Sequence, residues 1–163
     1  MSLFADSHYQ WRETYFVLFD VRHRPSAADV QRAVGELEAR LQVQEVLADD
    51  DGLLESMTVL SHADSAGMDI SYISGDEVKE QLVELRKEWR GQNFSSGDKL
   101  KAELALQANA RYDIFHFEEI GDAFLDEGAD DVALDPGTLL LVLSKLAKLC
   151  HGVSIDPQSG TVL

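Results

Sequence analysis

The sequence has little cysteine and no long hydrophobic run. Its 163 residues include one cysteine, Cys150, so an intramolecular disulfide or a zinc site built from several cysteines is excluded. Because Cys150 lies in an apolar helical pattern, we expect an inert buried thiol. The run Leu139 to Leu143 is far shorter than the roughly 20 residues that span a bilayer. The first eleven residues show no secretion signal, so we expect a cytoplasmic protein without a membrane partner.

Basic residues are also scarce. The chain has 14 Lys and Arg against 30 Asp and Glu, for a formal net charge of −16. Affinity for phosphate backbones comes from clustered basic side chains, so we expect no nucleic-acid partner. The basic residues are unevenly spread. None occurs between Tyr112 and Ser144, whereas half of them lie between Lys79 and Arg111.

Signatures of catalysis and of metal binding are missing as well. The chain has no GxGxxG, P-loop or GxSxG pattern, and these are the motifs that bind nucleotides or present a nucleophilic serine. The acidic turn at Asp49 and the acidic stretch from Asp126 to Asp135 lack the glycine spacing of a calcium loop. The five histidines show no spacing suited to a metal. We therefore predict no catalytic residue, no metal and no cofactor.

The clearest structural signal is an apolar strand followed by an amphipathic helix. Tyr15 to Phe19 are five consecutive bulky residues, a pattern typical of a central strand buried on both faces. Ser26 stands three residues before Asp29, which predicts a helix cap. The helix that follows carries one apolar stripe at spacings of four, three and four, formed by Val30, Val34, Leu37 and Leu41.

The next elements repeat this design. The turn from Asp49 to Gly52 predicts a hairpin between strands at 43–48 and 53–60, and alternation from Met68 to Ile73 predicts another strand. Ser74 then predicts the cap of a second helix, whose stripe is Val78, Leu82, Leu85 and Trp89. Ser95 caps a short helix lined by Leu100, Leu104 and Ala108, and residues 112–117 form a further strand.

This order predicts an α+β fold, specifically a ferredoxin-like βαββαβ sandwich with an antiparallel-rich sheet and two helices side by side on one face. The hairpin and the short helix are insertions. We expect a single domain, residues 1–163. Residues 1–11 form a flexible or peripheral N-terminus, 12–117 the sandwich, and 118–135 an acidic loop. Residues 136–163 form a C-terminal helix, ended by a left-handed Gly152, and a β-hairpin packed on the same domain.

Two places are weak candidates for ligand binding. Arg22, His23 and Arg24 form a basic turn between a strand and a helix start, where an anion is favoured; the alternative is a solvated turn whose arginines pair with carboxylates. Asp69, Tyr72 and His116 are polar groups on strands. His116 and Glu118 could form an acid/base pair, and His151 could meet Asp156, although Asp156 is better explained as the cap of its own turn.

These observations favour a non-catalytic interaction or regulatory module, with a protein partner or a homodimer formed through a sheet edge or a helix. The rival hypothesis is an enzyme or a small-ligand binder. It would use a pocket near Arg22 to Arg24 or around Asp69, Tyr72 and His116, and the ligand is unknown.

Overall fold

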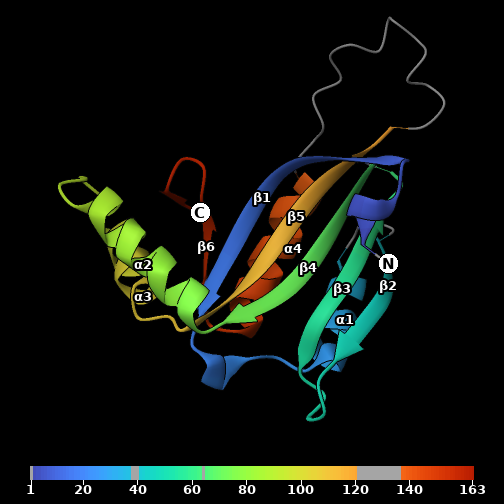
Figure 1. Cartoon of the computed structure of the whole chain (residues 1–163), viewed down its shortest axis with the longest axis horizontal. Coiled ribbons are helices and arrows are strands. Elements are labelled where there is room, and N and C mark those ends of the chain that lie inside the picture. The colour runs from blue at the N-terminus through green and yellow to red at the C-terminus, as the bar shows by residue number, and fades with distance from the viewer. Residues whose placement is uncertain (1, 38–40, 64, 121–136) are drawn as a thin grey trace, which may run out of the picture.

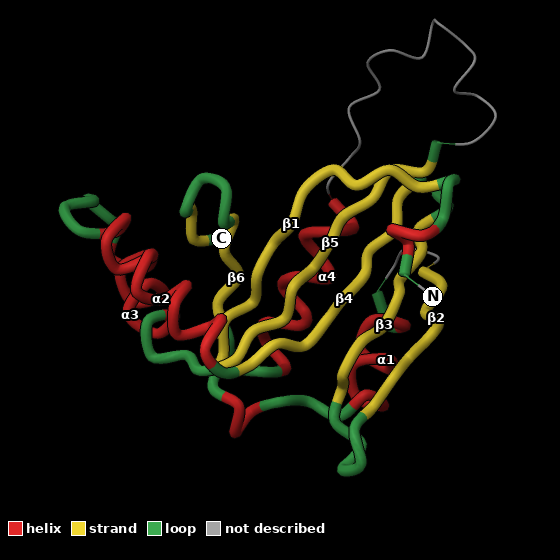
Figure 2. The backbone as a smooth tube through the Cα atoms, in the orientation of Figure 1, coloured by secondary structure: helices red, strands yellow, loops and turns green. Residues whose placement is uncertain are grey.

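Seven strands form one antiparallel sheet in the computed structural model, which describes residues 2–37, 41–63, 65–120 and 137–163. The strand order is β2-β3-β4-β5-β1-β6-β7 (Figure 2). The strands are β1 (Tyr9–Phe19), β2 (Leu41–Ala48), β3 (Leu54–Ser61), β4 (Ala66–Ser74), β5 (Ala110–Glu119), β6 (Val153–Asp156) and β7 (Thr161–Val162). The helices are α1 (Ala27–Gly35), α2 (Asp76–Trp89), α3 (Ser96–Ala105) and α4 (Gly137–Leu149), with 3-10 turns η1 (Leu3–Ala5) and η2 (Val21–His23).

Strand β1 lies inside the sheet, as its apolar run predicts. It pairs with β5 from Tyr9 to Phe19 and with β6 from Phe16 to Leu18. Alternate side chains of a strand point to opposite faces. Val17 and Phe19 enter one hydrophobic core and Leu18 enters another. The apolar run therefore supplies both faces of the sheet.

Helices α1 and α4 cover one face of the sheet, and Figure 1 shows them together behind it. Their buried residues include Val30 and Val34 of α1 and Leu139 and Leu143 of α4. These side chains share the largest core with Tyr112 and other residues of the central strands. Helix α4, which sequence reasoning placed after the sandwich, is thus part of its main core.

Helices α2 and α3 pack on the other face, where Leu18 points. All four residues of the predicted α2 stripe are buried, in a second core that includes Val153 and Ile155 of β6. The prediction that the first two helices lie side by side is therefore wrong, because Val30 and Val78 belong to different cores. The α+β class holds, but a ferredoxin-like arrangement is not confirmed, since the sheet has seven strands and β1 lies between β5 and β6.

Two of the three predicted helix caps are confirmed. The Ser26 and Ser95 hydroxyls accept hydrogen bonds from the N–H groups of Asp29 (3.0 Å) and Asp98 (3.2 Å). The Ser74 cap is wrong: Gly75, at φ 92°, precedes α2 and provides no side-chain cap. Helix α1 ends at Gly35, and Leu41 lies in β2.

The N-terminal segment, expected to be peripheral, packs on the sheet. Leu3 in η1 is buried, and Phe4 makes edge contacts with Phe115 and Phe117 at ring-centroid distances of 5.2 and 4.7 Å. Residues 9–11 already belong to β1. Of the expected acidic loop, Glu118 and Glu119 complete β5, and residues 121–135 lie outside the described residues. None of the described helices is long and apolar enough to cross a membrane.

The end of α4 differs from the expected glycine stop. His151 adopts the left-handed conformation, with φ 53°, a region in which non-glycine residues are uncommon. Gly152 serves another purpose, because an added Cβ would lie 2.6 Å from the Leu18 carbonyl oxygen and 3.0 Å from the Phe19 Cβ. Gly152 lets the chain pass close to β1, and His151 is the residue that adopts the left-handed conformation.

Candidate functional site

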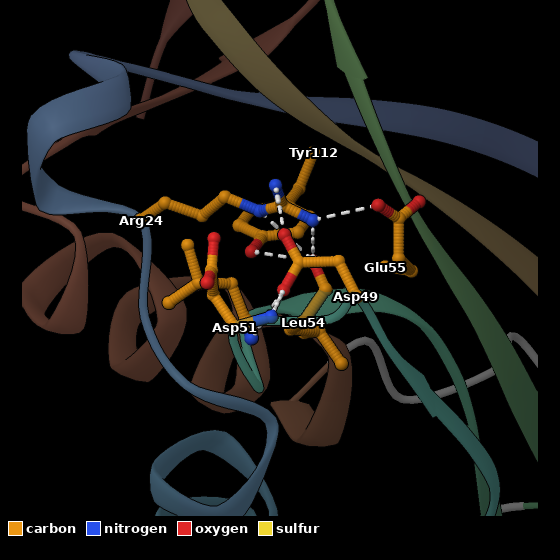
Figure 3. A network of polar contacts seen from close by, with 7 residues as sticks. Arg24, Asp49, Asp51, Leu54, Glu55 and Tyr112 are labelled. Carbon is orange, nitrogen blue, oxygen red and sulfur yellow. Dashed lines mark hydrogen bonds and ion pairs between the residues drawn. The ribbon is translucent and has the colours of Figure 1, made fainter.

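Arg24 is the centre of a network that ties three parts of the fold together (Figure 3). Its guanidinium donates to the Leu54 carbonyl at 3.0 and 3.3 Å, to Asp49 at 3.0 Å and to Glu55 at 2.9 Å. The guanidinium carbon also lies 3.7 Å from the centre of the Tyr72 ring, within the range of a cation–π contact. Only 8% of the Arg24 side chain is exposed. Each of the three guanidinium nitrogens therefore donates to a group of the same chain.

The same network explains the acidic turn after β2. Asp49 accepts from the N–H groups of Asp51 and Leu53, each at 2.9 Å, while its second oxygen receives Arg24. Such a side-chain-capped turn needs no ion. Tyr112 donates to the Leu54 carbonyl at 3.2 Å, and its burial raises its pKa. Arg24 and Tyr72, both candidates for ligand binding, are therefore brought together as parts of the scaffold.

Arg22 and His23 point elsewhere, although they are neighbours of Arg24. Arg22 pairs with Asp20, with a shortest contact of 2.7 Å, and this hydrogen bonding lowers the pKa of Asp20 to about 2. The His23 ring lies 4.7 Å from the ring of His151, centre to centre. Asp20, Arg22, His23 and His151 line a small cavity of 210 Å³. Arg22 and His23 thus line one cavity near this turn, and Arg24 is not part of its lining.

Asp69 holds the N-terminal segment against the sheet. One carboxylate oxygen accepts from the Thr58 hydroxyl at 2.7 Å. The other accepts from the Ser2 hydroxyl at 2.7 Å and the Leu3 N–H at 2.8 Å. A hollow of 390 Å³ opens beside it, lined by Ser2, Glu45 and other residues. Because both oxygens already have donors, the carboxylate acts as a structural anchor for η1.

His116 is buried and faces a different carboxylate from the one expected. Its Nδ1 lies 3.1 Å from Glu13 across the β1–β5 pair, whereas Glu118 pairs with Arg12 at 3.0 Å. His116 pairs with Met68 and Glu13, and Asp69 lies opposite Phe115. Asp69 and His116 therefore point to opposite faces of the sheet, and the proposed cluster of Asp69, Tyr72 and His116 does not form.

Sequence reasoning missed a second buried arginine. Arg111 donates to Asp113 at 2.7 Å and to Gln81 at 2.6 Å, and its guanidinium carbon lies 4.5 Å from the centre of the Phe16 ring. Removal from water raises the pKa of Asp113, and Arg111 partly offsets this shift. This pair joins β5 to α2 and is another part of the scaffold.

An open groove lies between α3, α4 and β6. It is a groove of 670 Å³ whose apolar lining includes Leu104 of α3, Leu140, Leu143 and Ala147 of α4, and Val153 of β6. Its polar lining includes Lys101, Lys148 and His151. His151 also lines the small cavity beside His23. The left-handed turn at the end of α4 thus places an imidazole between the groove and the cavity.

The walls of the groove expose large hydrophobic side chains. On α3, Leu100 is 68% exposed and Leu104 is 49% exposed, while Ala102 and Ala105 are buried. On α4, Leu140 is 45% exposed. The spacing of Leu100 and Leu104 predicted that they lie on one face of a short helix. Both side chains are exposed, and Leu104 lines the groove.

The polar side chains that line this groove are hydroxyl, ammonium and imidazole groups. Among its described lining residues there is no aspartate, glutamate or cysteine side chain. Cys150 lies close by in sequence but is buried, and burial raises its pKa to about 12, so it is a poor nucleophile. His151 faces His23, and Asp156 instead caps its own turn, accepting from Gln158 N–H and the Ser159 hydroxyl at 3.0 Å each.

Across the described part of the chain, no three His, Cys, Asp or Glu side chains group in a way that could hold a metal ion. The groove residues carried no recognisable motif. The helical spacing of Leu104 with Leu100 could be recognised, but such spacing does not distinguish a buried stripe from an exposed one. Comparisons with protein-family models, with curated proteins and with solved structures find no match to this chain.

Proposed function

We propose that this chain is a non-catalytic, cytoplasmic protein-interaction module whose partner docks on the groove between α3, α4 and β6. The observation that carries the proposal is a groove of 670 Å³ whose lining includes two exposed leucines from different helices, Leu104 of α3 and Leu140 of α4. Apolar surface gathered at one place and rimmed by polar groups is typical of interaction sites.

A small apolar ligand is the second candidate for this groove. Its volume of 670 Å³ lies within the range of about 300–1,000 Å³ that is usual for ligand sites. Lys101, Lys148 and His151 would then orient an anionic group of the ligand. This alternative keeps the ligand-binding hypothesis but moves it from Asp69, Tyr72 and His116, on the central strands β4 and β5, to a site beside β6.

The test is capture of bound proteins and small molecules with the wild-type chain and three variants. Leu104→Glu and Leu140→Glu place a charge in the groove, whereas Val83→Glu places the same charge on an exposed site of α2 outside the groove lining. We expect a bound protein that is retained by wild type and Val83→Glu and lost from both groove variants. Proteins that are captured equally well by wild type and by both groove variants would refute the proposal. A groove-dependent small molecule without a protein would favour the alternative.

A further inference from the structure

Basic side chains line the groove, although the chain as a whole has a strongly negative net charge. Lys148 and His151 enter from the end of α4, and Lys101 enters from α3, where its ammonium donates to the main-chain oxygen of Leu163 at 3.2 Å. No acidic side chain is among its described lining residues, although the full chain has 30 acidic and 14 basic residues. The basic lining therefore favours a binding partner that carries carboxylates.

The backbone around the groove favours a helix over a strand as the occupant. Strand addition needs a free edge on β6, but Val162 already pairs with Ile155, and the Leu163 N–H donates to the Ser154 carbonyl at 2.9 Å. The two longer walls are helices, and Leu140, Leu143 and Ala147 of α4 line the groove at helical spacing opposite Leu104 of α3. An amphipathic helix laid between such walls is an established mode of recognition.

A second copy of the chain docking groove to groove is disfavoured. In a two-fold symmetric contact the same patch meets itself. Both surfaces of such a contact would carry Lys101 and Lys148 and no acidic lining side chain, and this like charge opposes the contact.

We infer that the groove binds an amphipathic helix of a partner protein whose apolar stripe is flanked by Asp and Glu. This inference depends on the proposed function and adds the chemistry of the partner. The leucines of the partner fill the space between Leu104, Leu140 and Val153. Its carboxylates lie near Lys101 and Lys148, so salt weakens the contact.

The experiment is a selection from a displayed library of 16-residue peptides against the full chain. The library fixes leucine at helical positions i, i+3, i+4 and i+7 and draws every other position from Glu, Lys, Gln and Ser. We expect selected peptides rich in Glu beside the leucines, with no binding to Leu104→Glu or Leu140→Glu and unchanged binding to Val83→Glu. Circular dichroism checks that each variant is folded.

Charge reversal gives the sharper result. Lys148→Glu should weaken the selected peptides about fivefold at 50 mM salt, and much less at 500 mM, where charges are screened. Selection against Lys148→Glu should shift the enriched residue toward Lys. As a control, Lys79→Glu on α2 changes net charge equally outside the groove lining and should have little effect.

The possible failures are distinguishable. Groove-dependent peptides without acidic enrichment would overturn the carboxylate inference and leave the interaction module intact. No peptide sensitive to the Leu104 and Leu140 variants would refute helix docking at this groove and, with a negative capture experiment, the proposed function too. A concentration-dependent dimer of the chain that Leu104→Glu dissociates would assign the groove to a second copy and also overturn the inference.

Discussion

At the scale of single residues, the two arginines of the turn after β1 should differ greatly in their effect on stability. Arg24 is nearly buried and bonds to Leu54, Asp49 and Glu55, while Arg22 makes an exposed pair with Asp20. Arg24→Met removes a buried charge whose partners remain, so we expect the free energy of unfolding to fall by about 3 kcal/mol. Arg22→Met should change it by less than about 1 kcal/mol.

Urea denaturation of both variants measures this difference. Arg24→Lys is a useful third form, because lysine keeps the charge but cannot reproduce the forked hydrogen bonds. We expect Arg24→Lys to fall between wild type and Arg24→Met. Equal losses for Arg22→Met and Arg24→Met would contradict the view that Arg24 belongs to the scaffold.

Cys150 provides a prediction about pH. Burial raises its pKa from the ordinary 9.0 to about 12. Between these values the thiol ionises in the unfolded chain but not in the folded one, so its contribution to stability is lost as pH rises above about 9. Measuring the free energy of unfolding of wild type and of Cys150→Ala from pH 7 to 10.5 isolates the contribution of the thiol. The alanine variant should show the shallower decline.

The same burial makes Cys150 slow to react. Thiol reagents need an accessible thiolate, so at pH 8 an aromatic disulfide reagent should modify native protein only as fast as the chain opens. In urea it should react at once. Rapid modification of native protein would show that the α4 terminus is open.

At the scale of elements, helices α2 and α3 show what an apolar stripe predicts and what it does not. Both carry leucines at helical spacing, yet Leu82 of α2 is buried and Leu104 of α3 is half exposed. Leu82→Ala should therefore cost about 2–4 kcal/mol. Leu104→Ala should cost under about 0.5 kcal/mol. Thermal and urea denaturation of the two variants test the contrast, and a large loss for Leu104→Ala would mean that α3 packs with its stripe inward.

This contrast also shows how far the sequence predicts the elements. Caps and hairpins are local, so Ser26, Ser95 and the Asp49–Gly52 turn were recognised correctly from neighbouring residues. The face that a helix presents to the sheet depends on partners far away in the chain. The candidate site was missed for that reason, because Leu104, Leu140 and His151 come together only through the packing of three elements.

At the scale of the whole molecule, the run from Tyr15 to Phe19 correctly predicted a strand in the interior of the sheet. It could not predict the helix arrangement, since a strand with apolar side chains on both faces accepts helices on either one. The matching stripes of α1 and α2 suggested neighbours, but Val17 and Phe19 face α1 and α4 while Leu18 faces α2.

The net charge of −16 leads to a prediction for the whole molecule. Self-repulsion destabilises a compact chain of high net charge, and salt screens it. We expect the melting temperature to rise by a few degrees between 0.05 and 0.5 M NaCl, as scanning calorimetry would show. A fall over this range would mean that attractive ion pairs outweigh the repulsion.

The position of β1 in the sheet determines when this strand can pair during synthesis of the protein. Tyr15 pairs with Ile114, and Leu18 pairs with Val153, so β1 pairs with strands that are synthesised much later than β1 itself. The β2–β3–β4 meander can form earlier, because its partners are successive in sequence. We therefore expect slow folding governed by distant contacts, with Tyr15 to Phe19 in need of a chaperone during translation.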